Sequence, residues 1–194
     1  MSEYVILANS TCDITKEMEE ELELKMIPLS VNIEDETYRS YDPKEFYQRM
    51  REGAMPSTNA VNIGDYVDAI EPILSSGKDV LILAFSSGLS TTYNSAAMAA
   101  RELSEKYPER KVYAVDTLCA SMGEGLLVWH AAGLKKAGKS IEEVRDWVVK
   151  NRLSVCHWFT VNDLHHLKRG GRVSAATAIV GSMLGIKPVL HVDN

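Results

Sequence analysis

The chain has 194 residues, is 45% hydrophobic and carries a formal net charge of -6. This composition is typical of a soluble globular protein, and the acidic balance disfavours nucleic-acid binding, which usually needs a basic face. No basic segment followed by an apolar one opens the chain, and the longest uncharged run, 173–186, is shorter than the ~20 residues of a membrane span. Three distant cysteines without a C-x-x-C pair fit a reduced compartment. We therefore expect a soluble, cytoplasmic protein.

Short apolar runs alternate with segments of helical periodicity along the chain. Strands are expected at 5–8, 26–31, 80–84, 112–115 and 155–161, and a turn at 56–59. Helices are expected from about 15, from 43, from 66 to 73, from 93 to before Pro108, and at 126–137 and 141–149. The apolar strands lack the polar alternation of half-exposed strands. This pattern predicts an α/β fold with a parallel sheet and helices on both faces.

The last 42 residues are expected to begin a second α/β domain or its connection. Residues 1–152 form the predicted first domain, which carries the candidate site, and 153–194 form the incomplete second part. A helix at 175–184, apolar on nearly every side, is expected to be buried or to face an apolar ligand. A strand at 188–192 is followed by Asp193-Asn194, a common start of a turn. We therefore expect the chain to be truncated at its C-terminus.

The serine-rich segment 86–92 is the first candidate site. Ligands of open parallel sheets bind beyond the carboxyl ends of the strands, where 9–13, 86–92 and 116–117 carry hydroxyl or carboxyl groups. A Ser/Thr-rich turn that opens a helix combines hydroxyls with unpaired N–H groups at the positive end of the helix dipole. That combination suits a carboxylate or phosphate, and simple helix capping is the alternative.

The basic segment 168–174 is the second candidate. Gly170 and Gly171 allow backbone conformations closed to other residues, and Arg172 offers a planar fork for a carboxylate or phosphate. The alternative is a solvated helix end capped by glycine.

Other motifs argue against metal and cofactor sites. His165 and His166 are adjacent and cannot share a helix face, and Cys156-His157 has no second pair at zinc spacing. Neither a Walker A motif nor G-x-G-x-x-G occurs. Residues 88–92 lack the closing glycine of a nucleophile elbow, and no histidine is nominated as a base for Ser90. We expect no metal, no cofactor and no catalytic residue.

Six segments, in chain order, are similar to motifs that occur together in one family. They are 9–14 (D-S-T-x-D-L), 26–29 (I-P-L), 86–93 (S-S-G-L-S-G-T-Y), 116–123 (D-S-x-x-x-S-x-G), 167–174 (L-x-K-G-G-R-I-S) and 185–190 (x-K-P-x-L). Over its whole length the chain thus resembles the DegV family of bacterial fatty-acid-binding proteins. It departs from the family pattern at three positions. Asn9 replaces an Asp, and Thr91 replaces a Gly. Asn59 stands directly after Thr58, where the family has a Ser.

The resemblance implies a protein that buries one long-chain fatty acid between an α/β domain and a second domain. The carboxylate would be held by Thr58 and Ser90, with Arg172 at the same entrance, and Asn59, Ser10 and Gly171 are further candidate ligand-binding residues. The resemblance also implies a non-catalytic role, as the acyl-binding subunit of an ATP-dependent fatty acid kinase. Two alternatives stay open: an enzyme (hydrolase or phosphotransferase) acting on a small carboxylate or phosphate substrate, and a module that binds another amphiphile, such as a bile acid or retinoid.

Overall fold

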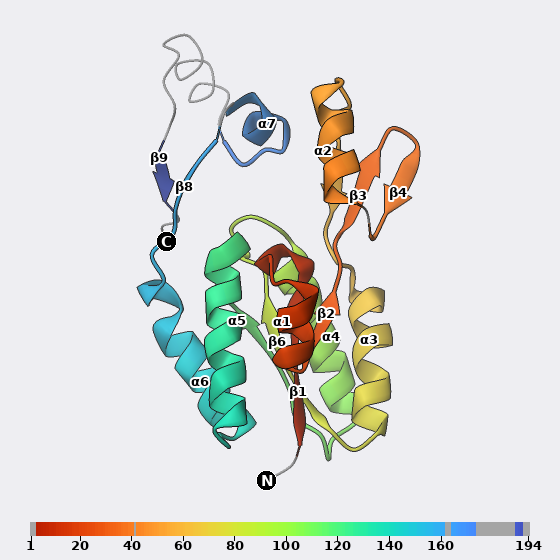
Figure 1. Ribbon diagram of the computed structural model, residues 1–194. Coiled ribbons are helices and arrows are strands. Elements are labelled where there is room, and N and C mark those ends of the chain that lie inside the picture. Colours follow the sequence, from red (N-terminus) through yellow and green to blue (C-terminus); the bar gives the residue numbers. More distant parts are fainter. Residues whose placement is uncertain (1–2, 41, 162–163, 174–188, 192–194) are drawn as a thin grey trace. The chain divides into compact units, whose positions relative to one another are not determined.

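The computed structural model describes residues 3–40, 42–161, 164–173 and 189–191 (Figure 1). The chain divides into two compact units, Met1–Val155 and Cys156–Asn194.

The first unit is built on a four-stranded parallel sheet with the order β2-β1-β6-β7. The strands are β1 (Tyr4–Asn9), β2 (Leu24–Ile27), β6 (Asp79–Ala84) and β7 (Val112–Asp116). The chain leaves β1 toward β2 on one side and continues to β6 and β7 on the other. The strand order therefore reverses between β1 and β6, and such a reversal opens a crevice at the carboxyl ends of the two strands.

Helices cover both faces of this sheet, as the sequence predicts (Figure 1). On one face α5 (Ser121–Lys136) and α6 (Ile141–Asn151) pack against the side chains of Ile6 and Leu81. On the other face α3 (Ile63–Ser75) and α4 (Thr92–Lys106) pack against those of Leu7 and Ile82. Neighbouring residues of one strand thus enter opposite cores, because successive side chains of a strand point to opposite faces. This explains why most positions of these strands are apolar, on both faces of the sheet.

A second, antiparallel sheet of the first unit was not predicted from the sequence. Its order is β4-β3-β5, with β3 (Ser30–Ile33), β4 (Glu36–Tyr38) and β5 (Ser57–Asn59). The single strand expected at 26–31 is wrong, because the chain leaves the parallel sheet after Ile27 and enters the antiparallel one at Ser30. Pro28, which has no N–H to donate, lies at this change of sheet. The turn expected at 56–59 is also wrong, since β5 pairs with β3 there.

The remaining helices of the first unit are short, and two of them are capped by a side chain. Helix α1 (Lys16–Glu21) is preceded by Thr15, whose hydroxyl accepts from the backbone N–H of Met18. Helix α2 (Pro43–Arg51) begins at its proline, behind a cap by Asp42. The 3-10 turn η1 (Ser10–Cys12) follows β1 directly, and η2 (Arg152–Ser154) follows α6.

The described part of the second unit contains β8 (Trp158–Thr160), α7 (Leu164–Arg169) and β9 (Val189–His191). Strands β8 and β9 pair antiparallel. The strand expected at 155–161 is present as β8 and is shorter than predicted. The apolar helix expected at 175–184 lies outside the described residues, as does Ser174.

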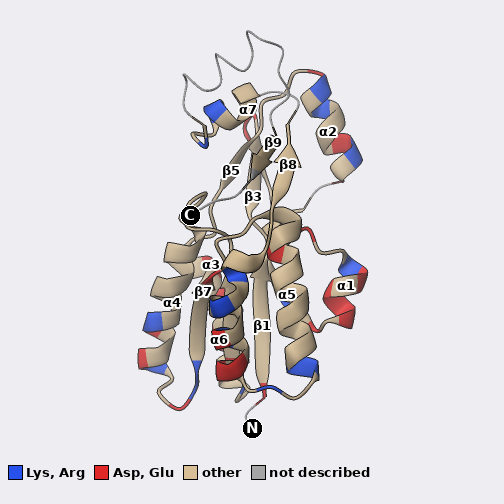
Figure 2. Ribbon diagram, turned by 90° about the vertical axis from the view of Figure 1, so that its left-hand side faces the viewer, with Lys and Arg blue, Asp and Glu red and all other residues tan. Residues whose placement is uncertain are grey.

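Charge and hydropathy show no sign of a basic stripe or a membrane span in the described residues. Figure 2 shows acidic and basic residues together on α4 and on α6, whereas β1 carries no charge. Among the helices that the structure describes, none is long and apolar enough to cross a membrane.

Candidate functional site

Asn9 joins the carboxyl ends of β1 and β6 at the point where the strand order reverses. Its side chain is 0% exposed, and its Oδ1 accepts from the backbone N–H of Phe85 at 3.1 Å. Its Nδ2 donates to the hydroxyl of Tyr66 on α3 at 2.9 Å. Burial raises the pKa of the Tyr66 phenol above its usual value, so this hydroxyl stays neutral. An uncharged amide can both donate and accept here, and it links the ends of β1 and β6 to α3.

The serine-rich loop 86–92 is attached to the end of β7. The backbone N–H of Ser86 donates to the carbonyl of Cys119, and that of Ser87 donates to Asp116 Oδ1 at 3.2 Å. The same carboxylate oxygen accepts from the backbone N–H of Leu118 at 3.0 Å. Asp116 is buried by these contacts and therefore serves to hold the loop in place.

Ser90 ends this loop at the beginning of α4, as the sequence predicts. Its Oγ accepts from the backbone N–H of Thr92 at 3.2 Å and lies 2.8 Å from Thr92 Oγ1. The first N–H groups of a helix lack intrahelical partners and carry partial positive charge, so the Ser90 hydroxyl stands at a favourable place for an anion. Within the described ranges, the hydrogen bonds of Ser90 Oγ join it to Thr92 and to no histidine or carboxylate.

Thr58 and Asn59 lie on opposite faces of the antiparallel sheet. Thr58 is paired with Val31 of β3 and shares its face, which also buries Ile33. Asn59 is paired with Ser30, and its Nδ2 donates to Ser30 Oγ and to Asn32 Oδ1, both at 3.1 Å. Because side chains alternate along a strand, one ligand on the Val31 face meets Thr58 and not Asn59.

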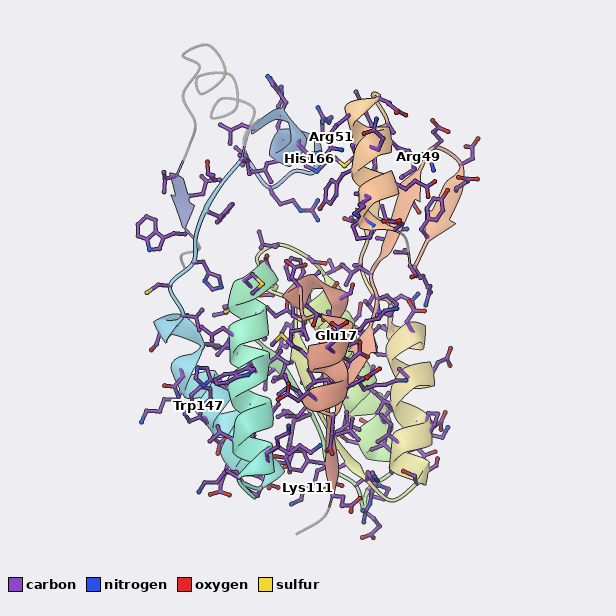
Figure 3. All side chains as sticks on the ribbon, in the orientation of Figure 1. Glu17, Arg49, Arg51, Lys111, Trp147 and His166 are labelled. Carbon is purple, nitrogen blue, oxygen red and sulfur yellow. The ribbon has the colours of Figure 1, made fainter. Side chains whose placement is uncertain are left out.

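Helix α2 is connected to the β3–β4 hairpin through Arg49 (Figure 3). Its Nη1 donates to the hydroxyl of Tyr38 at 3.0 Å, and its guanidinium lies 3.5 Å from Glu36 and 3.8 Å from Glu34. These contacts are largely exposed, and exposed pairs contribute little stability.

Ser10 has a structural contact of its own. Its Oγ accepts from the backbone N–H of Leu29 at 3.1 Å. Leu29 lies where the chain passes from one sheet to the other, so Ser10 connects the end of β1 to this passage.

Glu124 is a feature of this edge that the sequence analysis missed. The side chain is 0% exposed in the first turns of α5, and its Oε2 accepts from Thr11 Oγ1 at 2.8 Å. Among the described residues its Oε1 has no hydrogen-bond partner. Burial raises the pKa of this carboxyl well above its usual value, Thr11 opposes this shift through its hydrogen bond, and the charge of Asp13 adds to it. The only signal in the sequence is that Glu124 is the single acidic residue of an apolar helix.

Helix α5 approaches η1 closely at the residue next to Glu124. A Cβ atom at Gly125 would lie 2.4 Å from the carbonyl oxygen of Cys12, closer than two atoms can pack. Only glycine fits there without a shift of the backbone, and the Thr11–Glu124 hydrogen bond depends on this close packing.

Strained backbone gathers at the same edge of the sheet. Asp13, Leu118 and Ser121 have φ values of 51°, 53° and 51°, a left-handed conformation that is costly for residues with a side chain. The Ser121 hydroxyl donates to Asp13 Oδ2, which joins the loops after β1 and β7. Strain of this kind concentrates at functional sites, and here it lies in the segments that follow β1 and β7.

Gly171 and Arg172 belong to the second unit, at the end of α7. Gly171 has φ 74°, and its N–H donates to the carbonyl of Lys168, while that of Arg172 donates to Leu167. This is a glycine cap of a helix. The Arg172 guanidinium is exposed and donates to the carbonyl of Gly170. Among the residues described, no group of three or more His, Cys, Asp or Glu could hold a metal ion.

Comparisons with known proteins place the chain in one family. A family described as "Uncharacterised protein, DegV family" matches residues 3–194. A DegV domain-containing protein from Clostridium perfringens is 46% identical over 199 residues, which cover 100% of this chain and 68% of the relative.

Solved structures share the fold. The structure of DegV, a fatty acid binding protein from Bacillus subtilis, has a TM-score of 0.85 at 35% identity, covering 100% of this chain and 69% of that one. A stearic-acid-binding protein from Eubacterium ventriosum has a TM-score of 0.90 at 28% identity, covering 98% and 67%. The chain described here belongs to the DegV family.

Proposed function

We propose that this chain binds a long-chain fatty acid and holds its carboxylate through the hydroxyls of Ser90 and Thr58 and the guanidinium of Arg172. The observation that carries the proposal is Ser90 at the start of α4, where a hydroxyl and the positive end of a helix meet. A buried carboxylate needs charge-assisted hydrogen bonds of this kind. The acyl chain would contribute about 0.8 kcal/mol for each buried CH₂ group. Similar solved proteins are described as fatty acid binding, which supports the same ligand class here.

The other candidate residues take supporting roles in this proposal. Ser10 and Asn59 use their side chains within the protein, on Leu29 and on the Ser30–Asn32 edge. Gly171 gives the backbone the left-handed conformation that precedes Arg172. Residues 1–152 would carry the head-group site, and 153–194 would begin the second domain.

We further propose a non-catalytic, cytoplasmic role in which an ATP-dependent fatty acid kinase acts on the bound carboxylate. The hydrogen-bond partner of Ser90 Oγ in the described residues is Thr92, and a threonine cannot serve as the base of a serine hydrolase. This contact favours binding over the alternative of an enzyme acting on a small carboxylate or phosphate.

The proposed function is tested by competition against a fluorescent fatty acid on the delipidated 194-residue chain. A free long-chain acid should displace the probe, and the methyl ester of the same acid should bind about tenfold or more weakly, because it loses charge-assisted hydrogen bonds. Equal competition by acid and ester would mean that only the acyl tail is recognised. A chain that never takes up the probe would contradict the proposal.

A further inference from the structure

The hydroxyls of Ser90 and Thr92 form a pair whose two members differ in burial. Their oxygens lie 2.8 Å apart, and Ser90 Oγ also accepts from the backbone N–H of Thr92 at 3.2 Å. Thr92 is 0% exposed, whereas Ser90 is half-buried. In the part of the chain that the structure describes, neither hydroxyl has another hydrogen-bond partner.

Burial decides which of the two hydroxyls is the donor. If Ser90 donated to Thr92, the Thr92 proton would be enclosed without an acceptor, and folded proteins avoid buried donors of that kind. If Thr92 donates to Ser90, its proton is satisfied and its oxygen needs no further partner. Thr92 is therefore the donor.

This direction determines what Ser90 can offer to a ligand. Ser90 Oγ receives two hydrogen bonds from one residue, the N–H and the O–H of Thr92, and both of its lone pairs are engaged. Its own proton points away from both donors. Hydrogen bonds in a chain polarise one another, so a hydroxyl that accepts two of them becomes a better donor.

We propose that Thr92 is a positioning residue, whose buried hydroxyl holds Ser90 as a donor toward the ligand head group and so selects a head group that accepts. This inference rests on the proposed function, because it assigns Ser90 to the fatty acid carboxylate. A carboxylate oxygen meets the requirement. An alkyl ammonium does not, since it offers only donors to an oxygen whose lone pairs are occupied.

The test compares Thr92→Val, which has nearly the same shape without the hydroxyl, with Thr92→Ser, which keeps the hydroxyl. Affinity for a long-chain fatty acid is measured by competition on the 194-residue chain, and urea unfolding confirms that each variant is folded. Thr92→Val should bind about three- to tenfold more weakly, the effect of losing one hydrogen bond, and Thr92→Ser should stay within about twofold of the unmodified chain. An alkyl amine of the same length should compete poorly with the unmodified chain and with Thr92→Ser, in which both lone pairs of Ser90 Oγ stay occupied.

A double-mutant cycle separates positioning from a purely structural role. In a Ser90→Ala background, Thr92→Val should cause no further loss of affinity, because it acts through Ser90. An equal loss in both backgrounds, or full affinity of Thr92→Val where Ser90→Ala is weakened, would overturn the inference. If Ser90→Ala binds fatty acid with normal affinity, the roles proposed for Ser90 and Thr92 in holding the carboxylate are wrong, and the chain still binds fatty acid.

A neutron structure of the deuterated chain tests the inference without any ligand. A deuteron on Thr92 Oγ1 directed at Ser90 Oγ supports it, even if the chain takes up no fatty acid. A deuteron on Ser90 Oγ directed at Thr92 would contradict it.

Discussion

Replacing Ser90 with alanine should weaken fatty acid binding by about tenfold or more, because hydrogen bonds to a charged group are worth about 1.5–3 kcal/mol. The variant removes the hydroxyl at the start of α4 and leaves the helix itself in place. It also removes the acceptor of the Thr92 N–H, which should lower the free energy of unfolding by about 1 kcal/mol, the usual net contribution of one hydrogen bond. Competition against a fluorescent fatty acid gives the affinity, and urea unfolding gives the stability.

Ser87→Ala is the matched control for this variant. Ser87 lies in the same loop, but it is exposed, and its contact with Asp116 uses the backbone N–H, which alanine retains. Its affinity should equal that of the unmodified chain. Equal losses in the two variants would show that the loop, and not the Ser90 hydroxyl, determines binding.

Replacing Glu124 with glutamine should make the protein more resistant to urea, increasingly so as the pH rises. Burial raises the pKa of Glu124 in the folded state, so between its ordinary value and the raised one the folded chain keeps a proton that the unfolded chain releases. The stability of the unmodified protein is therefore intact below the ordinary carboxyl pKa and falls by up to about 1.4 kcal/mol per pH unit above it. Glutamine removes this penalty and still accepts the hydrogen bond from Thr11.

The measurement is the difference in free energy of unfolding between Glu124→Gln and the unmodified chain at several values from about pH 5 to 8. That difference should grow with pH until the folded-state pKa is reached. Glu102→Gln, which makes the same charge change at an exposed position of α4, is the matched control for the substitution itself. If the free energies of unfolding of Glu124→Gln and of the unmodified chain changed with pH in parallel, the Glu124 carboxyl would be ionised in the folded protein.

The parallel sheet could be predicted from the sequence, because its strands are apolar on both faces and each enters two cores. The antiparallel sheet could not. Each of its strands has only three or four residues, and β5 consists of Ser57, Thr58 and Asn59, residue types that are common in turns. Its pairing with β3 is a contact between distant segments, and local sequence pattern carries no information about it.

The candidate site shows the same division. Ser90 could be predicted, since a strand end followed by serines and a helix is visible in the sequence. The Thr11–Glu124 contact joins residues 113 positions apart, and nothing near either residue indicates it. The side chains of Thr58 and Asn59 point to opposite faces because β5 is a strand. The turn expected at 56–59 does not predict this alternation.

Native mass spectrometry of the purified 194-residue chain, before and after organic extraction, tests fatty acid binding most directly. We expect an added mass that matches a long-chain fatty acid, its loss on extraction and its return when a fatty acid is supplied. Arg172→Ala should retain less of this ligand than Arg169→Ala, which removes the neighbouring exposed charge at the end of α7. A chain that carries no such mass after purification and gains none from added fatty acid would contradict fatty acid binding by this protein.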